Sequence, residues 1–246
     1  MNSNIIEIDL YGLAIAFLPV LPVLFILYRW NMGTGHALYS LTRMLGQLLI
    51  VGYFLAYIFN STSLLLISMI LMIMLFSSSW IALGTVSSYR KKLITNAFIA
   101  ITAGGGSVLF IVIYGVIKPS PYYNPQYVIP LAGMIFANAM NAVSLAAERI
   151  VSELKRGETF IASRVTALQA AMIPVTNSLL AVGLVSLPGM MTGQILSGVS
   201  PLIAARYQIV VMCMIYASAG LSAALFLWRS RPQLENILVE KPIPPR

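Results

Sequence analysis

Amide side chains and methionines are the residues that could bind a substrate in the apolar parts of this chain. Asn138 and Asn141 recur at helical spacing with Met134 and Leu145, which predicts that both amides share one helix face. Amide oxygens accept hydrogen bonds, and thioether sulfur is a ligand for soft metals. The residues that we expect along a substrate pathway are Asn138, Asn141, Asn177, Met190, Met191 and Gln194.

A structural interpretation of the same residues stays open. Amides in membrane helices form interhelical hydrogen bonds, and methionine fills irregular apolar cores. Because the chain holds 13 methionines, their presence alone does not distinguish packing from ligand binding. We therefore assign no metal site and treat the pathway as a hypothesis.

Several kinds of chemistry are disfavoured by what the sequence lacks. It has no G-x-x-x-x-G-K-[ST] motif, so the chain does not cradle nucleotide phosphates itself, and the glycines at 104–106 suit close helix packing. No apolar block contains Asp or Glu, and the last contains no lysine. This excludes a retinal protein and an intramembrane aspartyl protease and argues against an ion-coupled carrier. The one histidine, His36, lies in a predicted turn, so we expect neither catalytic residues nor a cofactor on this chain.

Apolar segments of membrane-spanning length must position the candidate side chains. Of the 246 residues, 59% are hydrophobic and 9% are charged, whereas a soluble domain carries about 25% charged residues. This excludes a soluble enzyme and predicts an all-α, polytopic transmembrane bundle, because about 20 apolar residues cross a bilayer. The seven predicted spans are Leu10–Tyr28, Leu38–Phe59, Leu64–Leu83, Ile94–Ile117, Tyr127–Ala147, Thr166–Leu187 and Tyr207–Trp228.

The basic residues predict the orientation of these spans. With the N-terminus outside, 13 of the 15 Lys and Arg residues face the cytoplasm, and only Lys118 and Arg206 lie outside. The topology is therefore predicted as N-out and C-in, and the net charge of +8 needs no nucleic-acid partner. Residues 1–11 carry Glu7 and Asp9 but no basic residue, so we expect the first span to be retained rather than cleaved as a signal peptide.

Two connections differ from ordinary loops. Residues 148–165 form the longest cytoplasmic connection, and their apolar spacing predicts a short amphipathic helix with a break at Gly157. Residues 186–201, SLPGMMTGQILSGVSP, are expected to break the helix at Pro188 and Gly189 and to form an irregular external turn that lines a cavity. No linker separates a further domain, so residues 1–246 are predicted to form a single transmembrane domain.

Three strings carry a resemblance to a known family: GQLLIVGYFL (46–55), NAMNAVSLAAERI (138–150) and GLVSLPGMMTGQILSGVSPLIAARYQIVVM (183–212). Together they resemble the FetB/YbbM-type permeases of ATP-binding-cassette (ABC) transporters, which include plant aluminium-tolerance relatives. The likeness extends from about Arg43 to Trp228. It implies a multi-pass permease subunit of the plasma membrane (the cell inner membrane) that exports an iron-like metal ion or a small metabolite.

The resemblance also implies partners. A permease without a nucleotide site needs a separate ATPase, and the charged connection between spans could transmit force to it. The residues expected at the ATPase interface are Glu148, Arg149, Glu153, Lys155, Arg156 and Glu158. We also expect a second permease copy in the complex, in contact with the lipid bilayer. The alternatives are an ion-coupled carrier, a non-transporting scaffold or sensor subunit, and, for the connection alone, a plain membrane-surface helix.

Overall fold

The computed structural model describes residues 8–59 and 63–240, and within these ranges every regular element is a helix. This confirms the predicted polytopic helical membrane bundle. The chain divides into two compact units, an N-terminal unit (Met1–Ser61) and a C-terminal unit (Thr62–Arg246). The candidate residues of both predicted sites belong to the C-terminal unit.

In the N-terminal unit, the first predicted span consists of two helices instead of one. α1 (Leu10–Ile15) and α2 (Val20–Arg29) are separated by turns, because Pro19 and Pro22 cannot donate the backbone hydrogen bonds that would continue α1. α3 (Thr34–Phe59) follows and completes this unit. No described residue of the unit is buried, so its apolar faces need lipid or protein to cover them.

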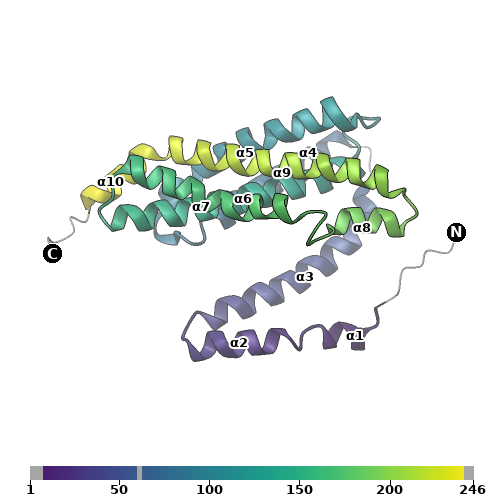
Figure 1. Ribbon diagram of the computed structural model, residues 1–246, viewed down its shortest axis with the longest axis horizontal. Coiled ribbons are helices and arrows are strands. Elements are labelled where there is room, and N and C mark those ends of the chain that lie inside the picture. Colours follow the sequence, from purple (N-terminus) through teal and green to yellow (C-terminus); the bar gives the residue numbers. More distant parts are fainter. Residues whose placement is uncertain (1–7, 60–62, 241–246) are drawn as a thin grey trace. The chain divides into compact units, whose positions relative to one another are not determined.

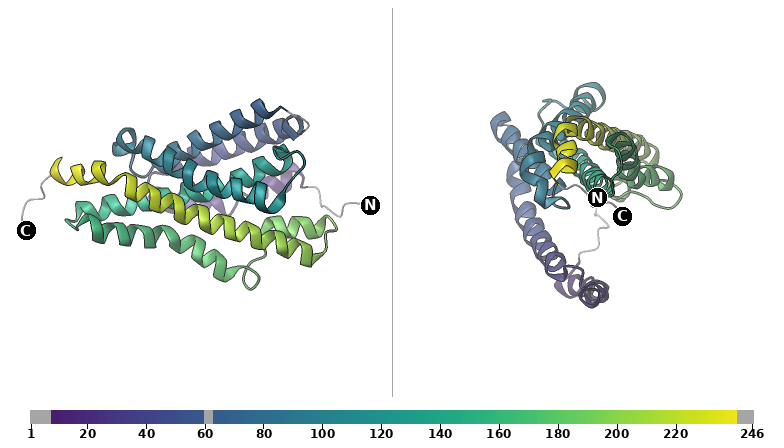
Figure 2. Two further views of the ribbon diagram at one scale, coloured as in Figure 1. Left: turned by 90° about the horizontal axis from the view of Figure 1, so that it is seen from above. Right: turned by 90° about the vertical axis from the view of Figure 1, so that its left-hand side faces the viewer.

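The C-terminal unit is a bundle of long helices that run along one another (Figures 1 and 2). Its elements are α4 (Leu64–Ala82), the 3₁₀ turn η1 (Ser87–Tyr89), α5 (Arg90–Ile111), the π-helical turn η2 (Val112–Ile117), α6 (Pro125–Lys155), α7 (Phe160–Ala181), α8 (Gly189–Leu196), α9 (Pro201–Arg229) and α10 (Arg231–Glu240). α9 packs against α5, α6 and α7, while α4 packs against α5 and α6. This arrangement makes α6 and α9 the central pair.

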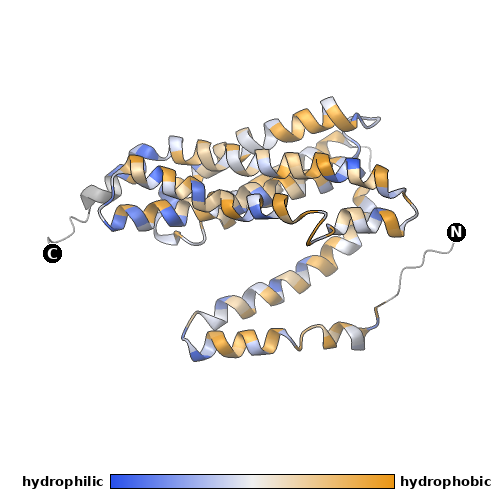
Figure 3. Cartoon of the chain, in the orientation of Figure 1, coloured by the Kyte–Doolittle hydropathy of each residue, from blue (hydrophilic) through white to orange (hydrophobic). Residues whose placement is uncertain are grey.

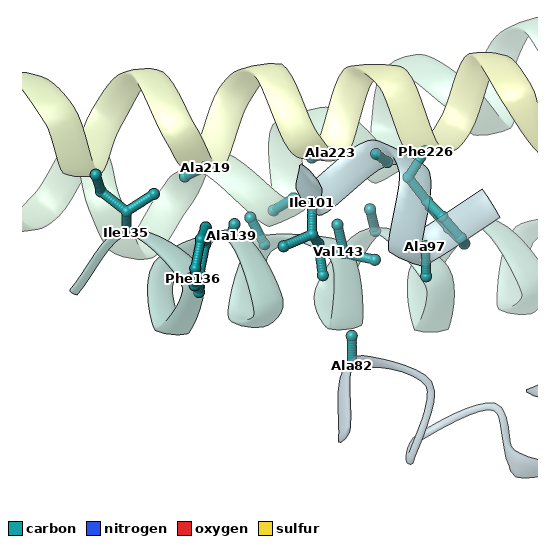
Figure 4. Close-up of a cluster of buried hydrophobic side chains, with 14 of the residues drawn as sticks. Ala82, Ala97, Ile101, Ile135, Phe136, Ala139, Val143, Ala219, Ala223 and Phe226 are labelled. Carbon is teal, nitrogen blue, oxygen red and sulfur yellow. The ribbon is translucent and has the colours of Figure 1, made fainter. Parts of the chain in front are cut away.

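The core of this unit lies where α5, α6 and α9 meet (Figure 4). Six fully buried side chains there are Ala97 and Ile101 of α5, Ala139 and Val143 of α6, and Ala223 and Phe226 of α9. The alanines let the helix backbones approach closely, as small residues do at helix contacts in membranes. The larger side chains fill the space that remains between the helices.

Among the described residues, six helical segments are long and apolar enough to cross a membrane, and they coincide with six of the seven predicted spans. The remaining prediction, 166–187, falls on α7, whose apolar character is reduced by Arg164, Gln169 and Asn177. α7 nevertheless packs lengthwise against α6 and α9 (Figure 1). Its 22 residues reach about 33 Å, which matches a hydrocarbon core of about 30 Å.

Charged residues gather at one end of the C-terminal unit, which we call the basic end (Figure 3). The described basic residues there are Arg90, Lys91, Lys92, Arg149, Lys155, Arg156, Arg164, Arg229 and Arg231. They meet because α5 and α7 begin at this end and α6 and α9 finish at it. The opposite end carries Lys118 and Arg206, so the helix directions segregate the charges as the predicted orientation requires.

The expected short amphipathic helix at 148–165 is not a separate element. Residues 148–155 are the last two turns of α6, which continues unbroken from Pro125 to Lys155. The predicted break at Gly157 is confirmed, because Gly157 has a φ of +91° between α6 and α7. Buried Ile150 and Leu154 explain the apolar spacing: they face the bundle core and not the membrane surface.

Candidate functional site

The connection between α7 and α9 borders hollows that open at the surface of the C-terminal unit. α7 ends at Ala181, Val182 is extended, and Gly183 has a φ of +83°. This left-handed conformation commonly ends helices, and glycine adopts it most readily. The helix therefore ends well before Pro188, where we had expected the break. Pro188 instead precedes α8, so Met190, Met191 and Gln194 lie on a short helix and not at an irregular turn.

The first hollow, which we call the amide cavity, has a volume of about 540 Å³ and lies between α6, α7, α8 and α9. Its polar lining comes from Asn138, Asn177, Ser178, Ser186 and Gln208. Its other lining residues are apolar or glycine, and they include three methionines from three helices, Met134, Met190 and Met212.

A second hollow, the end cavity, has a volume of about 630 Å³ and lies toward the end of the unit opposite the basic end. Gln126, Tyr127, Gln194 and Tyr207 supply its polar groups. Met134, Met190 and Val211 line both cavities, so the two are adjoining parts of one site.

The structure brings together four of the six residues predicted for a pathway. Asn138, Asn177 and Met190 line the amide cavity, and Met190 and Gln194 line the end cavity. Asn141 and Met191 line neither cavity. Three residues turn a helix by about 300°, so Asn141 lies about 60° around α6 from Asn138, and it is exposed; its place on a pathway stays a prediction.

The Asn138 amide is oriented by its own helix. Its Nδ2 donates a hydrogen bond to the Met134 carbonyl oxygen over 2.8 Å. One of its donors is therefore used within α6, while no hydrogen bond from a described residue engages Oδ1.

Gln208 is the site residue that sequence reasoning missed. It lies on α9, lines the amide cavity and is only 5% exposed. Its Oε1 has no hydrogen-bond partner among the described residues, and the same is true of Gln194 Oε1 in the end cavity. One signal was available in the sequence: Gln208 is an amide at helical spacing with Val211, Met212 and Ile215. However, Gln208 stands at the edge of an apolar block, and a polar residue there is equally well explained by a position at the membrane interface.

The predicted coupling residues surround an ion-pair cluster at the basic end. Arg149 Nη2 lies 2.7 Å and Arg156 Nη1 3.5 Å from Glu153 Oε1. Glu153 is buried, whereas Arg156 and Glu158 are exposed in the turn before α7. The Glu153 carboxylate therefore holds the two arginines in place, and the exposed residues are the ones that a partner could touch.

The connection between α4 and α5 joins this cluster. A hollow of about 250 Å³ is lined on one side by residues 85–89 and on the other by Glu148, Val151, Ser152 and Lys155 of α6. Lys155 Nζ lies 5.6 Å from the centre of the Tyr89 ring, within the range of a cation–π contact. Two connections that are distant in the sequence thus form one surface at the basic end.

These arrangements can bind but offer little for covalent chemistry. Within the part of the chain that the structure describes, no charged side chain lines the amide or end cavity. In the described ranges, 8–59 and 63–240, no three His, Cys, Asp or Glu residues cluster as they would to hold a metal ion. The site is a neutral, acceptor-bearing hollow between helices.

Comparison with known proteins gives consistent matches. A family described as "Uncharacterised protein family (UPF0014)" matches residues 10–167 and 157–234. UPF0014 membrane protein slr1647 of Synechocystis sp. is 36% identical over 77% of this chain and 79% of its own length. Probable iron export permease protein FetB of Escherichia coli is 35% identical over 92% of this chain and 91% of its own length.

A plant relative matches as well. Protein ALUMINUM SENSITIVE 3 of Arabidopsis thaliana is 32% identical over 85% of this chain and 81% of its own length. No solved structure matches the chain at a significant level. The residues matched by the family include both cavities and the basic end.

Proposed function

The chain belongs to the UPF0014 family of membrane proteins, and on this premise we propose that it is the permease subunit of an ABC transporter, powered by a separate ATPase chain. The observation that carries the proposal is the 35% identity, over 92% of this chain, to a protein named as an iron export permease. The chain is a multi-pass membrane protein, as such a subunit must be.

The energy source is proposed to be a partner chain because the sequence lacks a nucleotide-binding motif and the features that favour ion coupling. The sequence has no phosphate-binding loop. The predicted spans hold no carboxylate, the group on which proton and sodium relays usually depend. Both absences favour ATP hydrolysis on another chain as the energy source.

The ATPase is proposed to dock at the basic end, on the turn between α6 and α7 and the adjoining connection between α4 and α5. Lys155, Arg156 and Glu158 are exposed there, and Arg156 is held toward Glu153 by an ion pair. Because α6 runs without a break from this surface to Asn138 and Met134 at the cavities, a displacement at the turn would reach the site through one rigid helix.

The complex is proposed to contain two permease and two ATPase subunits and to export an iron-like metal ion or a small metabolite. Export as the direction, and iron as one candidate, come from the name of the Escherichia coli relative. The amide cavity and the end cavity would lie on the substrate route, since they bring polar groups together among mainly apolar residues.

Reconstitution of the full chain with a candidate ABC-type ATPase tests this proposal. We expect ATP turnover to rise when both chains share a liposome and iron(II) or another candidate substrate to move only when ATP is supplied. Transport driven by an ion gradient without nucleotide would identify an ion-coupled carrier. Absence of both ATPase stimulation and transport would identify a scaffold or sensor subunit.

A further inference from the structure

We infer that the amide cavity and the end cavity form one binding site for an organic molecule that is not an anion and that presents N–H or O–H donors. The inference rests on the proposed function, because it names the class of substrate that the permease would carry. It concerns binding by this chain alone, so it can be tested without the ATPase.

Size is the first argument. The two hollows have volumes of about 540 and 630 Å³ and share Met134, Met190 and Val211. Pockets for organic ligands typically measure about 300–1,000 Å³ and are mainly apolar with a few placed polar groups. A bare metal ion instead needs several ligand atoms within about 2.0–2.6 Å of one point, and hollows of this size do not impose such an arrangement.

The free acceptors are the second argument. Gln208 is 95% buried, since its exposed fraction is 5%, and its Oε1 has no partner among the described residues. A buried polar group without a partner is costly, so its presence requires an explanation. Gln194 Oε1 is in the same state in the end cavity, and the Asn138 side chain already uses a donor on its own helix. Both glutamine oxygens are almost inaccessible from the hollows, so a ligand that donates hydrogen bonds would reach them after a rotation of each side chain.

Charge is the third argument. Among the described residues no charged side chain lines either cavity, so an anion such as a nucleotide sugar would lose its hydration without gaining a cationic partner there. A hard metal ion would lack carboxylate ligands for the same reason. Met134, Met190 and Met212 provide flexible, polarizable walls, which suit organic ligands of irregular shape.

The test is a binding measurement on the full-length chain in lipid nanodiscs, with ethidium as the probe. Ethidium is a singly charged organic cation with aromatic amine donors, and its fluorescence reports binding. Tetraphenylphosphonium is the matched ligand without donors, and 8-anilinonaphthalene-1-sulfonate is the anion. We expect saturable ethidium binding, about tenfold weaker competition by tetraphenylphosphonium, since one hydrogen bond contributes up to roughly that factor, and no competition by the anion.

The decisive variant is Gln208→Met, which keeps the size of the side chain and removes the amide. Ethidium should bind about tenfold more weakly to it, while tetraphenylphosphonium binding stays unchanged; a general folding defect would weaken both. Gln169→Met is the matched control, because Gln169 is exposed on α7 and lines neither cavity. If Gln208→Met does not fold, Met190→Trp should block binding by filling both cavities, with Met191→Trp as its control.

Three results would overturn the inference. Ethidium that binds equally to the Gln208→Met and Gln169→Met variants would show that the free acceptor has no part in binding. Displacement of ethidium by silver(I) alone, lost in Met134→Leu, would identify a thioether metal site. Absence of saturable ethidium binding would indicate that lipid fills the two cavities. The ATPase test of the proposed function does not depend on that result.

Discussion

Replacing Gly104 by alanine should separate two helices that the fold requires to touch. A Cβ atom at position 104 would lie 2.5 Å from Ser222 Oγ, 2.7 Å from Ser222 N and 2.9 Å from Ser222 Cα. Carbon atoms in contact normally lie about 3.5–4.0 Å apart. Because two of these three atoms belong to the backbone of α9, no side-chain rotation relieves the clash, and α5 and α9 must move apart by about 1 Å.

The size of the effect follows from two opposing terms. Overpacking of a well-packed core costs about 1–3 kcal/mol, whereas replacing glycine by alanine inside a helix gains about 1 kcal/mol from helix propensity. Gly106, two residues along the same helix, has no atom within 4 Å of its Cβ position. Gly106→Ala therefore keeps the propensity gain without the clash, and the difference between the two variants isolates the clash.

Thermal unfolding of both variants in the same detergent measures this difference. At about 2–4 °C per kcal/mol for a chain of this size, Gly104→Ala should unfold about 2–12 °C below Gly106→Ala. Gly105→Ala should fall between them, because its Cβ would meet only side chains, at 3.1 Å from Ile135 Cγ2 and 3.2 Å from Phe136 Cδ1. Equal unfolding temperatures for Gly104→Ala and Gly106→Ala would refute the close approach of α5 and α9.

Three further predictions concern coupling, topology and the pathway. The double change Arg149→Glu with Glu153→Arg keeps the pair that now measures 2.7 Å but removes the carboxylate that holds Arg156. Because Arg156 is exposed on the proposed docking surface, ATP turnover should uncouple from transport while membrane insertion is unchanged; intact coupling would contradict docking at the basic end. A cysteine introduced at Ser120, with the native Cys213 replaced, should react with impermeant reagents from outside the cell, whereas one introduced at Lys91 should not. The reverse labelling pattern would show that the predicted orientation is wrong. Asn138→Ala should lower the transport rate about fivefold, the factor for one hydrogen bond. Asn141→Ala, at equal expression, should leave the transport rate unchanged. Equal losses in the two variants would indicate that both amides serve helix packing.

The class of protein and the position of most helices could be read from the sequence. Low charge and apolar blocks of membrane length are properties of consecutive residues, so they need no knowledge of tertiary contacts. The break at Gly157 was predictable for the same reason, since glycine is the least stable residue within a helix apart from proline. The segregation of basic residues also followed from their order along the chain.

Only the tertiary structure decided which polar residues share a site. Asn138 and Asn141 carry the same side chain three residues apart, but the position of α9 and α7 around α6 determines that only Asn138 lines a cavity. Met190 and Met191 are separated in the same way, because α8 is a helix whose neighbouring residues point in different directions. Gln208 becomes conspicuous only when packing buries its amide and leaves Oε1 without a described partner. Burial is set by contacts between residues far apart in the sequence, so no local pattern could have selected Gln208 over the other polar residues of the spans.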